Sequence, residues 1–160
     1  MIPTHFNVVL LSALLFGCGG LPLRQVNVRS WCNANRDMAT MLDLVVVYPE
    51  QPSKPLPVSG PEWFQQKPTL GGQLANEIDV LSLEVPPGCR GFSVRLPGRV
   101  ENATRVLAFA NYVAPGGQLA QDISAFECVE LTLLSDHVAL REVHDCTQAS
   151  RRCDDYACEP

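Results

Sequence analysis

Cysteine is the residue type that offers the most chemistry in this chain, with seven cysteines among 160 residues. Cys18 follows an apolar stretch near the N-terminus, and setting it aside leaves an even set. The even set comprises Cys32, Cys89, Cys128, Cys146, Cys153 and Cys158. Even sets are typical of disulfide-bonded proteins from oxidising compartments, and six cysteines allow fifteen pairings. We therefore expect up to three disulfides, with a connectivity that the sequence leaves open.

A metal site is the alternative use for these cysteines. Structural zinc sites usually contain ligand pairs that are close in sequence, such as Cys-x-x-Cys. The C-terminal cysteines lack that spacing, and His144 with Cys146 is too small a cluster to complete a site. We expect disulfides, no metal ion and no other cofactor.

Cys18 ends a motif that resembles the lipobox of bacterial lipoproteins. Residues 8–16 form an apolar run that is too short to span a bilayer but suits a signal peptide. The run leads into Gly17, a small residue of the kind that a signal peptidase accepts, and then Cys18. We expect cleavage before Cys18 and acylation of that cysteine, for example with palmitate. Because Phe16 is bulky and residues 1–7 carry no Lys or Arg, an ordinary signal peptide or a buried apolar segment is the alternative.

Two short clusters contain residue types that could catalyse a reaction. Ser135, Asp136 and His137 are contiguous, whereas the members of a catalytic triad converge from separate elements with fixed geometry. A tight turn explains this cluster better. His144 could activate Cys146, but a cysteine in an oxidised even set is expected to be paired. We expect no enzyme activity and no small-molecule substrate.

The charge balance argues against two classes of partner. The chain has 17 acidic and 12 basic residues, a net charge of −5, and residues 1–23 contain neither kind. Nucleic acid requires clustered Lys and Arg, and so does adhesion to anionic lipid through a basic patch. We therefore expect no nucleic-acid partner and a membrane attachment that comes from the lipid alone.

Apolar periodicity predicts a mainly β domain. Strands are expected at 25–31, 41–48, 78–85, 92–96, 105–112, 127–134 and 138–143. The run 41–48 is almost continuously apolar, which predicts a strand buried on both faces. About seven to eight short strands separated by Pro and Gly turn signals predict an antiparallel β-sandwich. The expected organisation is a signal peptide at 1–17, a lipidated tether at 18–23, the sandwich at 24–146 and a disulfide-tied tail at 147–160.

A short helix is expected between the second and third strands. Ser59 can cap the first free amides, and Glu62 stands at the capping-box position. Such a helix would stop before Pro68. At barely two turns it cannot stand alone, so Trp63 or Phe64 must anchor it on the domain. An exposed aromatic platform that stacks on a sugar is the alternative.

The order of these features along the chain is itself informative. A lipobox precedes a first strand ending in Cys32-Asn33-Ala34-Asn35, and a Val-rich second strand ends in Val47-Tyr48. A helical insertion with Trp63-Phe64 and a strand into Val85-Pro86-Pro87-Gly88 follow. This order resembles the outer-membrane lipoproteins of type VI secretion systems, the TssJ family, over residues 24–140. The resemblance implies a transthyretin-like β-sandwich with a short helical insertion.

The resemblance also implies a structural role. Members of that family sit on the periplasmic face of the outer membrane and hold the periplasmic part of a large inner-membrane partner, TssM. The loop between the first two strands makes the contact, and the matching positions here are 33–40. The candidate partner-binding residues are Asn33, Asn35, Arg36, Asp37 and Met38. Their types suit charge-assisted hydrogen bonds and an adaptable apolar contact, whereas a solvated loop that only satisfies turn geometry is the alternative.

A different class of function stays open at the level of the sequence. A periplasmic recognition lipoprotein could bind glycan or inhibit a hydrolase, and this function requires Trp63 and Phe64 to be exposed. The burial of the tryptophan separates it from the structural role.

A Cys18→Ser variant tests the lipid anchor. The unaltered protein should fractionate with membranes, because acyl chains partition into the bilayer. The variant should be soluble in the periplasm, as measured by cell fractionation and immunoblotting. A variant that still fractionates with membranes would rule out Cys18 as the anchor.

Overall fold

The computed structural model describes residues 20–88, 90–114, 118–144 and 146. The expected signal peptide, the lipidation site Cys18 and the tail 147–160 lie outside the described residues. Cys89, Cys153 and Cys158 lie outside them too.

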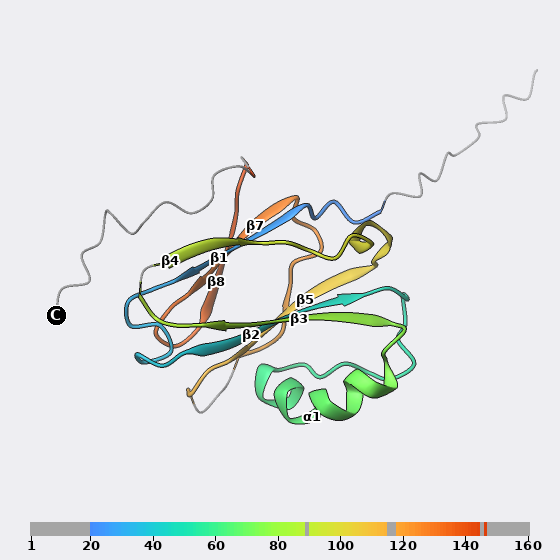
Figure 1. Ribbon diagram of the computed structural model, residues 1–160, viewed down its shortest axis with the longest axis horizontal. Helices are drawn as coiled ribbons and strands as arrows, with labels where there is room; N and C mark the ends of the chain where they lie inside the picture. Colours follow the sequence, from blue (N-terminus) through green and yellow to red (C-terminus); the bar gives the residue numbers. More distant parts are fainter. Residues whose placement is uncertain (1–19, 89, 115–117, 145, 147–160) are drawn as a thin grey trace, which may run out of the picture.

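Two four-stranded sheets pack face to face in the described part of the chain (Figure 1). The first sheet has the order β4-β1-β7-β8 and the second has the order β3-β2-β5-β6. The strands are β1 Gln25–Ser30, β2 Thr40–Val47, β3 Ile78–Val85, β4 Arg90–Val94, β5 Arg105–Asn111, β6 Gln121–Asp122, β7 Cys128–Leu133 and β8 Val138–Glu142. The described residues also form one α-helix, α1 (Gly60–Gln73), and one 3-10 helix, η1 (Val100–Asn102). The mainly β sandwich with a helical insertion is therefore confirmed.

One pairing departs from a purely antiparallel arrangement. β1 and β7 run parallel, from Gln25 opposite Cys128 to Ser30 opposite Leu133, whereas the other strand pairs are antiparallel. A parallel pair requires a long connection, and here the chain from β2 to β6, with α1, lies between the two strands. β6 was not expected, because two residues are too few to show the alternation of polar and apolar side chains that marks a strand.

Strand β2 contributes to both hydrophobic layers, as its continuous apolar run predicts. Leu42, Leu44 and Val46 lie in the core between the two sheets. Val45 and Val47 lie in a second cluster on the opposite side of the sheet, together with residues of α1. Figure 1 shows α1 covering this outer face of the second sheet.

The helix extends further than the sequence indicated. It was expected to stop before Pro68, but it continues through Pro68 to Gln73. A proline inside a helix costs about 3 kcal/mol. Burial of Leu70 within the extension and of Leu74 at its cap is worth about 1.5–3 kcal/mol each. Tertiary packing therefore outweighs the local penalty, and the expected end of the helix was wrong.

The start of the helix uses the expected residues with one change. Ser59 is the N-cap, and its hydroxyl accepts a hydrogen bond from the Glu62 amide at 3.5 Å. The Glu62 carboxylate accepts from the amide of Val58 at 3.3 Å, so the reciprocal bond forms one residue before the cap. The first residue of the helix, Gly60, packs directly against the backbone of β5. A Cβ added to Gly60 would lie 2.0 Å from the Ala110 carbonyl oxygen, so a side chain does not fit there.

A buried carboxylate holds the helix on the sheet. Asp43, in the middle of β2, is fully buried and accepts a hydrogen bond from Trp63 Nε1 at 2.7 Å. Lys67 Nζ lies 2.8 Å from the same carboxylate, and Trp63 stacks on Phe109 with the ring centroids 4.9 Å apart. A buried charge is costly unless it is paired and hydrogen-bonded. Asp43 therefore restricts α1 to positions that bring both donors to the carboxylate.

Two glycines of α1 should respond in opposite ways to alanine. Gly60→Ala places a methyl group against the β5 backbone and should lower the free energy of unfolding by about 1–3 kcal/mol or more. Gly71→Ala meets no atom within 4 Å and should raise it by up to about 1 kcal/mol through helix propensity. Urea unfolding of both variants measures the difference. Equal effects of the two substitutions would contradict the close contact between Gly60 and β5.

Candidate functional site

Four connections meet at one end of the sandwich. The β1–β2 loop (residues 31–39) lies beside the β7–β8 turn, since Ser30 is opposite Leu133. Thr40 is opposite Val85 and Met41 is opposite Asn111, so the ends of β3 and β5 are here as well. The chain enters β1 from residues 20–24 at the other end (Figure 1). We call the surface formed by residues 33–39, 112–114 and 134–137 the loop end.

The β1–β2 loop has an unusual backbone. Asn35, Arg36 and Asp37 have successive φ values of 47°, 55° and 64°, which form one left-handed turn without glycine. Backbone bonds from Arg36 to the Asn33 carbonyl (3.1 Å) and from Met38 to the Asn35 carbonyl (3.2 Å) close it. Left-handed non-glycine residues cost about 1–3 kcal/mol each and persist only when the surroundings hold them. The turn must therefore be held by contacts from outside the loop.

Asn35 supplies those contacts. Its side chain is only 2% exposed, and its Oδ1 accepts from the Val113 amide at 2.8 Å. Its Nδ2 donates to the carbonyls of Ala39 and Asn111, both at 3.3 Å, and its backbone amide donates to the Leu134 carbonyl at 3.0 Å. One asparagine thus ties the β1–β2 loop to two other loops.

The predicted partner-binding residues fall into two groups. Asn33, Arg36, Asp37 and Met38 are exposed, with Met38 55% exposed. Asn35 is buried, so its role in the structure is to position the others. The frequency of Asn and Asp in 33–37 was a signal for left-handed backbone, because these residues tolerate that region better than others.

Sequence reasoning missed the other residues of the loop end. Val113, after β5, is 45% exposed, and Asp136 and His137 are exposed in the β7–β8 turn. His137 Nδ1 lies 2.7 Å from Asp136 Oδ1. This contact, followed by smaller effects that include the charge of Arg36, holds the pKa of Asp136 below its ordinary value. These residues are far from 33–38 in sequence, so no local pattern connects them.

The Ser135-Asp136-His137 cluster has the geometry of a turn. The Leu134 amide donates to the His137 carbonyl at 2.9 Å, which closes the connection between β7 and β8. The same carbonyl accepts from Tyr112 Oη at 2.8 Å, and burial raises the pKa of this phenol above its ordinary value. Both contacts to His137 fix the backbone of the turn.

A polar cluster braces the opposite end. Tyr48 donates a hydrogen bond to the Asp79 carboxylate, Arg99 Nη2 lies 2.8 Å from Asp79 Oδ1, and the Arg99 guanidinium covers the Tyr48 ring. Burial and the bond to Asp79 raise the pKa of Tyr48 to about 12. Hydrogen bonds from Arg99 and then Tyr48 hold the pKa of Asp79 below its ordinary value. The tyrosine therefore stays protonated and the aspartate charged near neutral pH, which keeps the contacts of this cluster in place.

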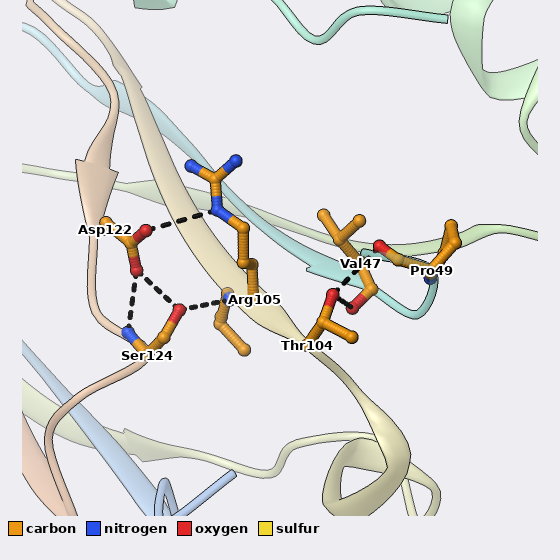
Figure 2. A network of polar contacts seen from close by, with 7 residues as sticks. Val47, Pro49, Thr104, Arg105, Asp122 and Ser124 are labelled. Carbon is orange, nitrogen blue, oxygen red and sulfur yellow. Dashed lines mark hydrogen bonds and ion pairs between the residues drawn. The ribbon is translucent and has the colours of Figure 1, made fainter. Parts of the chain in front are cut away.

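A groove of about 690 Å³ lies between the proline-rich segment 50–58 and the strands β5 and β6. Figure 2 shows the network beside it, in which Arg105 contacts Asp122 and Asp122 contacts Ser124. Burial acts to raise the pKa of Asp122, but the bonds from Ser124 and the charge of Arg105 bring it below its ordinary value. The groove is lined by apolar, proline and amide residues, by the Arg105–Asp122 pair and by Glu50, and its lining contains no histidine, cysteine or hydroxyl side chain.

Cys128 and Cys146 are joined by a disulfide with Cα atoms 5.6 Å apart, and Cys32 is disulfide-bonded as well. The other pairings stay predictions. Among the described residues no group of three or more His, Cys, Asp or Glu side chains could hold a metal ion. Within the same part of the chain, no helix combines the length and apolar character needed to cross a membrane.

Asn35 and Asn33 form a matched pair for testing the loop. Asn35→Ala removes three hydrogen bonds from a buried site and leaves alanine in a left-handed conformation, so the free energy of unfolding should fall by about 1–3 kcal/mol. Asn33→Ala, at an exposed position, should change it by less than about 0.5 kcal/mol. Chemical denaturation of both variants measures this. If Asn35→Ala is as harmless as Asn33→Ala, the amide does not hold the turn.

Comparison with known proteins places the fold. No protein-family model and no curated protein sequence matches the chain. Among solved structures, the type VI secretion lipoprotein TssJ1 from Pseudomonas aeruginosa is similar with a TM-score of 0.54 and 12% identity, covering 73% of this chain and 92% of that one. Lip from Serratia marcescens, a membrane-bound component of the type VI secretion system, is similar with a TM-score of 0.51 and 7% identity, covering 74% and 96%. The chain therefore has the fold of these type VI secretion lipoproteins.

Proposed function

We propose that this protein is a non-catalytic outer-membrane lipoprotein that anchors a type VI secretion membrane complex. The observation that carries the proposal is the fold, which two type VI secretion lipoproteins share over most of their length. The lipobox at Cys18 and the described start of the domain at residues 20–24 support a tether on the membrane side. The domain then extends from the periplasmic face of the outer membrane.

The loop end is the surface that holds the partner in this proposal. The partner is the periplasmic part of a TssM-like inner-membrane protein, and the contact uses Asn33, Arg36, Asp37 and Met38. Two features support it. The four side chains are exposed, and Asn35 holds the turn that carries them. A fixed loop loses little conformational entropy on binding, so more of the contact energy contributes to affinity.

The recognition-lipoprotein alternative lacks the feature it requires. Trp63 is fully buried between α1 and β5, and Phe64 is partly buried with Lys67 above its ring. Neither side chain is free to form a flat platform for a sugar. The structural role is therefore favoured over glycan binding through α1.

Charge reversal on the loop tests the proposal. Arg36→Glu and Asp37→Lys should each weaken binding to the purified periplasmic part of the TssM-like protein by about tenfold, since lost and repelling charges across an interface cost at least about 1.4 kcal/mol. Calorimetry measures the Kd. Lys54→Glu is the matched control, because Lys54 is exposed on the proline-rich segment, away from the loop end. The anchoring role is wrong if the unaltered protein does not bind, and the loop assignment is wrong if Lys54→Glu weakens binding as much.

A further inference from the structure

We propose that the partner's contact extends from the β1–β2 loop onto Val113 and the Asp136–His137 turn, with Met38 and Val113 as its apolar centre. This inference rests on the proposed function and enlarges its site. It assigns binding residues to the β5–β6 and β7–β8 connections, which the resemblance to the secretion lipoproteins does not assign.

The first support is the bridge made by the Asn35 side chain. One end of the amide donates to the carbonyl of Ala39, the neighbour of Met38, and the other end accepts from the amide of Val113. A single planar group spans these two backbones, so the loops that carry Met38 and Val113 lie side by side. A partner that covers both loops meets both side chains.

The second support is the exposure of these two side chains. Met38 is 55% and Val113 is 45% exposed, and they belong to a short set of exposed large apolar residues in the described part of the chain. The centre of a protein interface is more apolar than its rim. An adaptable methionine and a stiff valine on adjoining loops provide such a centre.

The third support is the group of charged residues near Met38 and Val113, which stand on a fixed backbone. Arg36 is exposed in the β1–β2 loop, and Asp136 and His137 are exposed in the β7–β8 turn, where the charge of Arg36 acts on Asp136. Gln118 Nε2 donates to the Asp136 carbonyl at 2.9 Å, and Tyr112 Oη donates to the His137 carbonyl. The turn is therefore held in place before any partner arrives.

These groups define the chemistry of the partner surface. It presents an apolar side chain to Met38 and Val113, a carboxylate to Arg36 and a basic group to Asp136. A folded protein domain can place all three at once. A polyanion matches only Arg36, and Asp136 repels it.

Val113→Ser tests the apolar centre, with Val58→Ser as the matched control. Both valines are exposed, Val58 by 65% and beside the groove, so both variants should retain the thermal unfolding midpoint. Val113→Ser should raise the Kd for the TssM-like periplasmic part about tenfold, because the partner then covers a hydroxyl group where it covered an apolar side chain. Val58→Ser should leave the Kd unchanged.

A second pair of variants tests the charged residues near Met38 and Val113. Asp136→Lys should weaken binding several-fold, because it repels the basic group of the partner. Glu50→Lys reverses an exposed charge beside the groove and should have no effect.

The outcomes separate this inference from the anchoring role. Weakening by Val113→Ser and Asp136→Lys, with no effect of their controls, supports the extended contact. If Arg36→Glu weakens binding but neither Val113→Ser nor Asp136→Lys does, the extended contact is wrong and the anchoring role stands. Absence of binding by the unaltered protein overturns both.

Discussion

The burial of β2 on both faces is the constraint on which the rest of the structure depends. One face of the strand closes the core between the sheets, and the other packs against α1. Asp43 is a charged residue in the middle of this strand, and it fixes how α1 packs on the sheet, because its carboxylate must meet both Trp63 and Lys67. A helix with a proline in its interior is stable in this position because β2 offers it an apolar surface and the buried carboxylate of Asp43.

The same strand fixes the loop end. β2 begins at Thr40, immediately after the β1–β2 loop, and its pairing with β5 brings Asn111 and Val113 beside that loop. The left-handed turn is unfavourable by itself, and Asn35 holds it only because the neighbouring strands place their carbonyl and amide groups within reach. The exposed loop is therefore an extension of the core, and its shape is set before a partner binds.

The sequence predicted what depends on local patterns. Alternation located the strands, and the continuous apolar run identified β2 as doubly buried. The predicted end of α1 was wrong, because the rule that proline ends a helix is local. The burial of Leu70 outweighs the cost of Pro68, and this burial depends on the fold. The parallel pairing of β1 with β7 and the proximity of Val113 to Asn35 join distant segments, so no window of sequence contains them. The left-handed backbone of Arg36 could not be predicted either, since arginine has no preference for that region.

Strand β1 connects the two ends of the domain directly. The chain enters it from residues 20–24, and it leads straight into the β1–β2 loop. It lies in the interior of the first sheet, with β4 on one side and β7 on the other. A pulling force between the tether and the loop therefore acts along the backbone of β1, which is already extended and has almost no further length to give. In the proposed anchoring role, this geometry lets a small domain transmit tension from its tether to its loop end through a single strand.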